Sequence, residues 1–215
     1  MKILGIEMKL LGHDSVKIKS EKTIYIDPFQ INPDEKADLI LITHEHFDHC
    51  NPEDIEKLVK DDTTLVGIQS CKNLFDQFSA TTKEIIFMKP GQKKTVAGVE
   101  IEAVPAYNVN KFREPGKSFH PKGEEKVGYI LSIDGKRIYH AGDTDVIDEM
   151  KNLGNIDIAF LPVSGTYVMT AEEAAKAVEL IKPKIAIPMH FGKVVGTKKD
   201  AEKFKSLAKC EVIIL

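Results

Sequence analysis

The sequence predicts an α/β fold in which two β-sheets pack face to face and helices cover their outer sides, a four-layer αββα sandwich. Strand-like apolar runs and helix-like periodic runs alternate in both halves of the chain, and hairpin signals join several strands. The composition, 42% hydrophobic and 29% charged, is typical of a globular protein. The length of 215 residues favours one domain, residues 1–215, and no repeat or linker divides it.

The first half of the chain is expected to be mainly strands. Leu39–Thr43 is an apolar run rich in β-branched residues, which indicates a strand buried on both faces. The helix after it begins at Asn51, an N-cap residue followed by proline at the first helical position. A short helix is expected from about Cys71 to Phe78, with Ser70 as its cap. The other strands are expected at Met8–Leu11, Val16–Lys19, Thr23–Ile26, Thr64–Ile68, Ile85–Met88, Thr95–Val96 and Val99–Val104.

Residues 107–126 lack periodicity, which is typical of a lid or a binding loop. After them, Asp134-Gly135 predicts a hairpin with a primed turn. Thr170 and Glu173 form a capping box that opens a helix to Ile181. The other strands are expected at Val127–Ile133, Lys136–Tyr139, Ile156–Val163, Ile185–Pro188 and Val212–Leu215, and the other helices near Val146–Asn152 and at Asp200–Ala208.

Charge and hydropathy exclude several classes of protein. The 30 basic and 33 acidic side chains give a net charge of −3, which argues against a general nucleic-acid-binding protein. No apolar run approaches the roughly 20 residues that cross a bilayer, so no membrane partner is expected. The N-terminus is interpreted as a folded strand rather than a signal peptide. The three cysteines form no metal or disulfide pattern, which favours reduced thiols and a cytoplasmic protein.

The strongest chemical signal is HEHFDH at 44–49, directly after a buried strand. Imidazole nitrogen and carboxylate oxygen are ligands that suit zinc, iron or manganese. In an extended chain His44 and His46 point to the same side and can hold one ion, whereas Asp48 and His49 follow a turn and can face a second ion. The alternative is a polar loop that caps the next helix, although such groups packed together would repel one another on protonation unless something binds them.

Two further ligand-type residues, Asp143 and His190, each follow a predicted strand. Gly142 lets the backbone approach closely just before the carboxylate. Taken alone, Asp143 is more often a turn residue and His190 a hydrogen-bonded core or surface histidine. Because sites in α/β sheets form beyond the carboxyl ends of strands, we expect three strand ends to converge on one site.

Together these motifs resemble the metallo-β-lactamase-fold hydrolase superfamily, and within it the single-domain branch that includes the L-ascorbate 6-phosphate lactonase. The resemblance covers essentially the whole chain. It rests on LGHDS at 11–15, DP at 27–28, HEHFDH at 44–49, PAYN at 105–108, YHAGDTD at 139–145 and PMHFG at 188–192. It implies the αββα sandwich of the metallo-β-lactamase fold, with one or two metal ions at one edge of the sheets.

The resemblance also implies a set of metal ligands, two for the first ion, three for the second and one carboxylate that bridges both. These are, in that order, His44 and His46; Asp48, His49 and His190; and Asp143. The superfamily usually has a third histidine on the first ion, where this chain has Asn108. Either Asn108 binds weakly through its carbonyl oxygen or His120 reaches in from the loop. Imidazole is the better ligand, which slightly favours His120; if neither binds, the enzyme works with one ion.

Three residues are expected around these ligands. Asp27 resembles a carboxylate that orients a ligand histidine, with a simple Asp-Pro turn as the alternative. His13 lies in a turn that resembles an edge of the site, and it could donate a hydrogen bond to substrate or ligand or be only a turn residue. His140 lies behind the ligands in one interpretation and is a buried, hydrogen-bonded histidine in the other.

The expected activity is hydrolysis by a metal-bound hydroxide at two divalent ions per chain, with zinc favoured over manganese or iron. Asp48, Asp143 and His13 are the expected catalytic residues. The expected substrate is an ester, lactone or phosphodiester of a small anionic metabolite, because the loop at 107–126 carries five basic and three acidic residues. The residues expected to contact it are Tyr107, Lys111, Arg113, Lys122 and Tyr167.

Two alternatives remain open from the sequence. The first is a small metallo-nuclease acting on RNA or DNA, because nucleases of this superfamily share the HxHxDH pattern. The short length of the chain and its net charge of −3 argue against a nuclease. The second is a metal-dependent binding protein without turnover. The sequence also leaves a homo-oligomer open.

Overall fold

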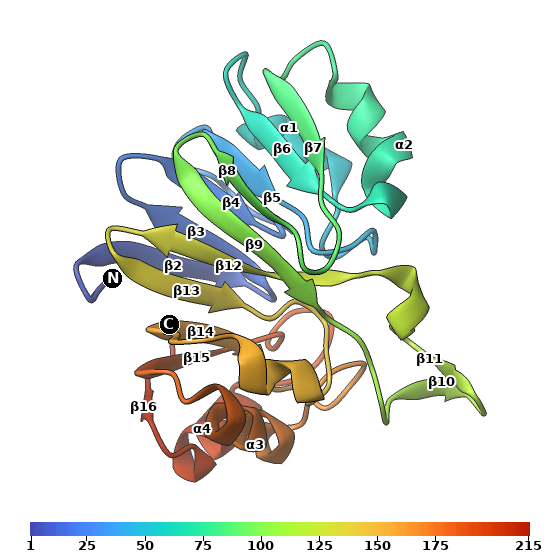
Figure 1. Cartoon of the computed structure of the whole chain (residues 1–215), viewed down its shortest axis with the longest axis vertical. Coiled ribbons are helices and arrows are strands. Elements are labelled where there is room, and N and C mark those ends of the chain that lie inside the picture. Colours follow the sequence, from blue (N-terminus) through green and yellow to red (C-terminus); the bar gives the residue numbers. More distant parts are fainter.

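Two seven-stranded sheets form the centre of the molecule in this computed structural model, which describes residues 1–215 (Figure 1). The first sheet follows chain order and consists of β1 (Lys2–Ile3), β2 (Ile6–Gly12), β3 (Ser15–Lys19), β4 (Thr23–Ile26), β5 (Leu39–Leu41), β6 (Thr64–Gly67) and β7 (Glu84–Phe87). Strands β1 to β4 pair antiparallel, and β4 to β7 pair parallel.

The second sheet repeats this plan. It consists of β8 (Lys93–Val96), β9 (Val99–Pro105), β12 (Val127–Ile133), β13 (Lys136–His140), β14 (Ile158–Pro162), β15 (Ile185–Met189) and β16 (Glu211–Val212). Strands β8, β9, β12 and β13 pair antiparallel in that order, and β13 to β16 pair parallel.

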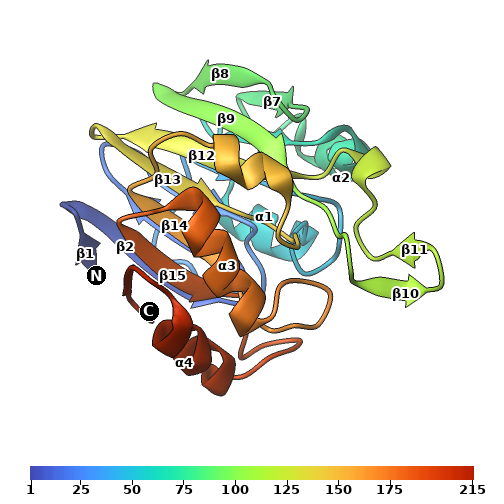
Figure 2. The ribbon, with the colours of Figure 1, turned by 60° about the horizontal axis from the view of Figure 1, so that its bottom comes forward.

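Helices cover the outer sides of the two sheets (Figure 1, Figure 2). Beside the first sheet lie α1 (Pro52–Leu58), the 3₁₀ turn η1 (Gln69–Cys71), α2 (Lys72–Phe75) and η2 (Asp76–Phe78). Beside the second lie η4 (Asp148–Asn152), α3 (Ala171–Ile181) and α4 (Lys198–Leu207). Helix α3 contacts β14, and α4 contacts β15. The predicted four-layer α/β sandwich is therefore confirmed.

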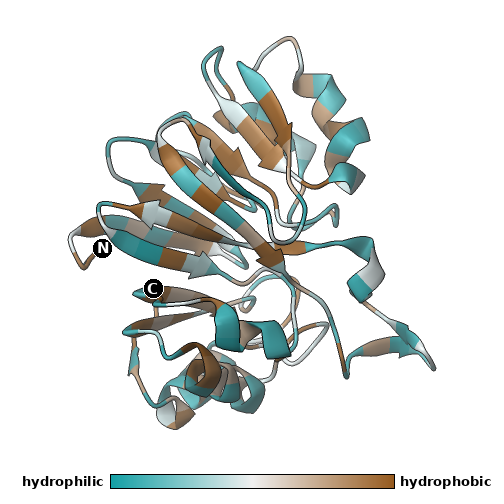
Figure 3. Cartoon of the chain, viewed as in Figure 1, coloured by the Kyte–Doolittle hydropathy of each residue, from teal (hydrophilic) through white to brown (hydrophobic).

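One continuous cluster of buried apolar side chains extends through both sheets and under the helices. Every residue of β4, β5, β14 and β15 is buried, as expected for the inner, mostly parallel strands of a covered sheet. In Figure 3 the strands carry most of the brown, apolar colour, and the helices show teal on their outward surfaces. None of the helices combines the length and the apolarity required to span a bilayer.

Several local signals act as the sequence predicts. The Asn51 side chain accepts a hydrogen bond from the Asp54 amide and caps α1. Thr170 and Glu173 form both hydrogen bonds of the capping box at the start of α3. Asp134-Gly135 has positive φ at both residues, which is the conformation of a type I′ turn.

The segment at 107–126 is more regular than the sequence predicts. It contains a small hairpin, β10 (Phe112–Glu114) and β11 (Lys117–Ser118), which projects from the body of the molecule (Figure 1), and the 3₁₀ turn η3 (Lys122–Glu124). Gly116 makes the tight turn with a φ of +79°. Strands of two and three residues are too short to show a period of two, so the sequence could not reveal them.

Other predicted boundaries are wrong in detail. The helix expected near Val146–Asn152 is the 3₁₀ turn η4, and the last strand is shorter than Val212–Leu215. Ser70 does not cap a helix, because its hydroxyl donates to the Glu45 carboxylate (2.8 Å) instead. Side-chain hydrogen bonds to distant segments compete with local capping, and only the tertiary structure decides between them.

Candidate metal centre

Strand ends from both sheets meet at one edge of the sandwich. The segment 44–49 follows β5, Asp143 follows β13, and His190 directly follows β15. The turn between β2 and β3 adds His13 and Asp14. All seven histidines of the chain lie in or against this site, so any histidine-bound metal in this protein must lie here.

Three imidazoles form the first group. Ligand atoms of His44, His46 and His120 lie within 4.8 Å of one another. His44 Nε2 is 3.0 Å from His46 Nδ1, and His120 Nε2 is 3.3 Å from the same atom. The expected pairing of His44 with His46 is therefore present, and His120 comes from the loop at 107–126 to join them.

A second group lies beside the first and contains His49 and His190 with three carboxylates. His49 Nε2 is 3.3 Å from Asp143 Oδ1, 3.6 Å from Asp14 Oδ2 and 3.9 Å from Asp48 Oδ2. His190 Nε2 is 3.5 Å from Asp143 Oδ2 and 4.0 Å from Asp14 Oδ2. Asp14 is the member that the sequence did not indicate as a site residue.

Asp143 connects the two groups. Its Oδ2 atom is 3.3 Å from His120 Nε2 and 4.0 Å from His44 Nε2, both of the first group. Its two oxygens also approach His49 and His190 of the second group. This is the geometry expected of a carboxylate that bridges two ions.

Hydrogen bonds behind the imidazoles point their Nε2 atoms into the site. His49 Nδ1 donates to Asp27 Oδ2 (2.9 Å), which also accepts from the Thr43 hydroxyl (2.6 Å). The Thr43 oxygen in turn lies 3.0 Å from His44 Nδ1. Asp27 therefore lies behind the His49 ring, which is the kind of position that the sequence predicts for it. Ser164 Oγ likewise lies behind an imidazole, 2.8 Å from His190 Nδ1. No local sequence pattern predicts this contact.

His120 and Asn108 occupy different positions. Asn108 Oδ1 accepts hydrogen bonds from both the amide and the Nδ1 of His120, at 2.9 Å each. The side-chain Nδ2 of Asn108 donates to the Tyr167 carbonyl (2.8 Å). The structure therefore brings His120 to the first group, while Asn108 lies behind it and orients its ring.

His13 and His140 are both fully buried and do not line the pocket described below. His13 Nε2 donates to Asp48 Oδ2 (3.1 Å), so the geometry gives His13 a positioning contact with a carboxylate. A catalytic role for it stays a prediction. His140 Nε2 donates to the Asp14 carbonyl (2.9 Å), which matches the interpretation as a buried, hydrogen-bonded histidine.

The protonation of the two groups differs. Burial lowers the pKa of His44 and His46 and lowers that of His120 to about 4, so these rings are neutral and keep free lone pairs. Burial acts in the same direction on His49, but nearby carboxylates, Asp143 first, outweigh it and raise its pKa well above the usual value. The Asp143 pKa is held well below its usual value because imidazoles, His49 first, outweigh burial. An ion in the second group would replace such protons.

The side chains present fit metal ions. Five buried atoms at the second group have no hydrogen-bond partner, namely His49 Nε2, His190 Nε2, Asp143 Oδ1 and both carboxylate oxygens of Asp14. Buried polar atoms without partners are rare, and each costs about 1–3 kcal/mol, more when the group is charged. A cation among them would satisfy all four residues at once.

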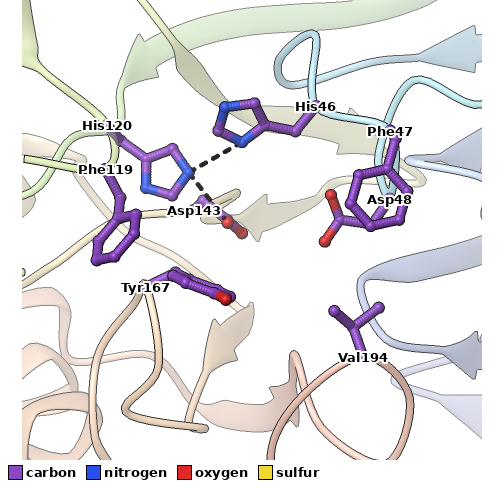
Figure 4. Close-up of a pocket in the computed structure, with 8 residues that line it drawn as sticks. All are labelled: His46, Phe47, Asp48, Phe119, His120, Asp143, Tyr167 and Val194. Carbon is purple, nitrogen blue, oxygen red and sulfur yellow. Dashed lines mark hydrogen bonds and ion pairs between the residues drawn. The ribbon is translucent and has the colours of Figure 1, made fainter. Parts of the chain in front are cut away.

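A pocket of about 330 Å³ opens onto this site (Figure 4). Its metal-ligand-type lining consists of His46, Asp48, His120 and Asp143. Its apolar and aromatic lining consists of Phe47, Phe119, Tyr167 and Val194. In Figure 4 Phe119 lies beside His120 and Phe47 beside Asp48, while Tyr167 and Val194 lie on the side opposite His46. Neither lysine nor arginine lines the pocket.

Of the five residues expected to contact substrate, only Tyr167 lines the pocket. Lys111 pairs with Glu173 (2.7 Å), and Lys122 pairs with Glu149 (2.8 Å). Tyr107 also bonds to Glu149 (2.9 Å). Arg113 lies over the Phe119 ring at 5.5 Å from its centroid. Lys111 and Lys122 are thus paired with acidic residues outside the pocket, whereas Arg113 contacts Phe119, which lines it. The sequence could not reveal these partners because most are distant in the chain.

Comparisons with known proteins identify the family. Residues 7–190 match the family described as beta-lactamase superfamily domain. A UPF0173 metal-dependent hydrolase of Thermococcus kodakarensis is 39% identical over 224 residues, covering 98% of this chain and 96% of that protein. The crystal structure of a candidate metal-dependent hydrolase from Parabacteroides distasonis has a TM-score of 0.82 and 37% identity, with 97% of this chain and 92% of that chain covered.

A metallo hydrolase of the archaeon Ignicoccus hospitalis has the same fold, with a TM-score of 0.76 at 24% identity and coverage of 98% of this chain and 94% of that chain. The narrower resemblance to the L-ascorbate 6-phosphate lactonase branch stays a prediction. The family match and the 39% identity along nearly the whole chain show that the protein belongs to the beta-lactamase superfamily and is a metal-dependent hydrolase with the metallo-β-lactamase fold.

Proposed function

We propose that this metal-dependent hydrolase works with two divalent ions, zinc in preference to manganese or iron, and cleaves an ester, lactone or phosphodiester of a small molecule. The observation that carries the proposal is the pair of adjoining ligand groups, joined by Asp143, at the floor of a pocket. Divalent ions bound there would lower the pKa of a water molecule towards neutrality and polarise a carbonyl or phosphoryl oxygen.

The chain's own residues divide the remaining work. The first ion would be held by His44, His46 and His120, and the second by Asp48, His49 and His190, with Asp143 between them. Asp143 and Asp48 are the carboxylates that line the pocket. They can therefore accept a proton from an attacking water and return it to the leaving group.

The side chains of the pocket wall favour a substrate with an uncharged, apolar group next to the scissile bond. Phe47 and Val194 are largely exposed, at 65% and 49%, and Phe119 packs edge-on against Tyr167 with ring centroids 4.7 Å apart. Exposed apolar side chains around a polar floor are typical of ligand-binding sites. The expectation of an anionic substrate rested on the basic loop residues, but Lys111 and Lys122 are paired with Glu173 and Glu149, and none of the loop's basic side chains lines the pocket. This arrangement favours an uncharged group over an anionic one at the pocket.

Phe47→Ala is expected to lower kcat/KM about tenfold for nitrophenyl butyrate, because burying part of a phenyl ring against substrate contributes about 1–2 kcal/mol. The effect should be smaller for the nitrophenyl monoester of succinate, which carries a carboxylate where butyrate has a methyl group. Phe112→Ala is the matched control, since Phe112 is 51% exposed and does not line the pocket. Equal losses with both esters, or with both variants, would contradict an apolar subsite.

The nuclease alternative lacks support from the pocket, which has no lysine or arginine in its lining to receive a phosphate backbone. Membership of a hydrolase family disfavours a binding protein without turnover. A cytoplasmic location and a homo-oligomer stay predictions from the sequence.

The function is tested with protein stripped of metal and reloaded with Zn²⁺ or Mn²⁺. We expect two ions per chain by elemental analysis, and hydrolysis of at least one member of a panel of aryl esters, lactones and phosphodiesters. Chelation should abolish turnover and metal addition should restore it. Cleavage of RNA or DNA without turnover of any small substrate would support the nuclease instead. An absence of bound metal would refute the proposal.

A further inference from the structure

Asp14 is a buried carboxylate of the second group to which the proposed function assigns no role. It lies in the turn between β2 and β3 and is fully buried. Both carboxylate oxygens lack a hydrogen-bond partner, although the backbone around them is well fixed. His140 donates to the Asp14 carbonyl, and the His190 amide donates to the His13 carbonyl (3.0 Å). A carboxylate held in this way, without a donor or an ion, would be strongly destabilising.

The distances around Asp14 are those of ligands that share one ion. Metal–nitrogen and metal–oxygen bonds of about 2.0–2.2 Å place neighbouring ligand atoms about 3.0–3.6 Å apart, and opposite ones about 4.2 Å apart. Asp14 Oδ2 lies 3.6 Å from His49 Nε2 and 4.0 Å from His190 Nε2. Those two nitrogens and Asp143 Oδ1 are themselves unpartnered. Atoms of all four residues lie within 4.8 Å of one another.

Asp48, the carboxylate that the HxHxDH motif supplies, is placed differently. One of its oxygens accepts a hydrogen bond from His13, and its side chain lines the pocket. Asp14 lies on the buried side and makes no such bond. Asp48 can therefore face solvent and substrate, while Asp14 places its negative charge on the buried side of the same group.

We propose that Asp14 is a ligand of the second metal ion. This inference rests on the proposed two-ion function and makes the second position richer in oxygen than the first. With Asp14, the second position has two carboxylates and two imidazoles whose ligand atoms lie within 4.8 Å of one another, and Asp48 lies 3.9 Å from His49 beside them, whereas the first has three imidazoles and Asp143. Oxygen-rich positions with more than four ligands suit Mn²⁺ or Fe²⁺, and histidine-rich tetrahedral ones suit Zn²⁺. Asp14 thus adds more to the affinity of the second position for Mn²⁺ than to its affinity for Zn²⁺, the metal proposed above for both positions.

The test titrates metal-free protein with Mn²⁺ and measures the free ion by electron paramagnetic resonance. The wild type should bind two ions, and Asp14→Asn, which keeps the size of the side chain, should weaken the second ion at least tenfold, since even residues behind a ligand change metal affinity about 10–100-fold. Repeating the titration with Zn²⁺ should give a smaller loss. Asp14→Ala should agree with Asp14→Asn in both titrations.

Asp145→Asn is the matched control. Asp145 is also buried, but it belongs to none of the ligand groups. It accepts hydrogen bonds from the Val109 and Asn110 amides, and its Oδ1 lies 3.4 Å from Lys111 Nζ. It should keep both ions. Thermal unfolding separates ligation from a structural role, because metal-free Asp14→Asn should unfold at a higher temperature than metal-free wild type and gain less on adding Mn²⁺.

The outcomes distinguish this inference from the function on which it rests. Two ions bound equally well by wild type and Asp14→Asn would overturn the role of Asp14 and leave the two-ion hydrolase intact. A wild type that binds a single ion, with the same affinity as Asp14→Asn, would overturn the second position itself. A wild type without metal affinity would overturn both.

Discussion

Asp143→Ala is expected to reduce kcat/KM by at least about a thousandfold and to reduce the bound metal from two ions to one or none. Asp143 is the carboxylate whose oxygens approach both ligand groups, at 3.3 Å from His120 and 3.3 Å from His49. A thousandfold loss corresponds to about 4 kcal/mol, within the several kcal/mol that a bridged metal site supplies to the transition state. The measurements are elemental analysis and turnover of the best substrate of the panel.

Asp148→Asn serves as the control for a lost carboxylate, because Asp148 is exposed and pairs only with Lys151. It should leave metal content and kcat/KM unchanged. An Asp143→Ala protein that keeps two ions and wild-type turnover would show that Asp143 is a turn residue, the alternative that the sequence left open.

His120→Ala is expected to remove the first ion and lower kcat/KM about a hundredfold or more, whereas Asn108→Ala should keep both ions and lose about 10–100-fold in metal affinity or activity. The reason is their order in the structure, since His120 Nε2 faces His46 and Asp143 while Asn108 Oδ1 holds the other ring nitrogen. Metal titration of the two variants beside wild type gives the comparison.

His120 is fully buried, so its replacement could also loosen the loop. His120→Gln retains a hydrogen-bonding side chain of similar reach and is the second variant to measure. If Asn108→Ala lost the first ion while both His120 variants retained it, Asn108 would be the ligand. This is the alternative in which Asn108 binds the ion through its carbonyl oxygen.

The layers of the fold follow from short-range patterns. Residues 39–42 are all apolar, which predicts a covered strand, and β5 begins there; Asn51 and Thr170 cap the helices that they were predicted to start. Each of these signals depends on residues within a few positions of one another, so the sequence displays them directly. The β10–β11 hairpin and the hydroxyl of Ser70 were missed because their partners are set by turns and contacts too short or too distant to form a pattern.

Some residues of the candidate site could likewise be predicted from short-range sequence patterns, and others could not. The HEHFDH segment carries its chemistry within six residues, and Asp143 and His190 each follow a recognisable strand. By contrast, no pattern in the sequence distinguishes Asp14 from any other aspartate in a turn. Its place in the site depends on β15 and the segment after β5, which bring His190 and His49 to within 4.0 Å and 3.6 Å of it. Its place beside His13 was the one signal that could have indicated it.

The sequence alone therefore determined the layered α/β architecture, the family and the core of the ligand set, since each is written in residues near one another along the chain. The tertiary structure decided that His120 rather than Asn108 joins the histidines, that Asp14 faces them, and that Lys111 and Lys122 pair with Glu173 and Glu149. These outcomes depend on distances of 2.7–4.0 Å between segments up to 176 residues apart (His190 and Asp14), and the packing of the whole chain sets such distances.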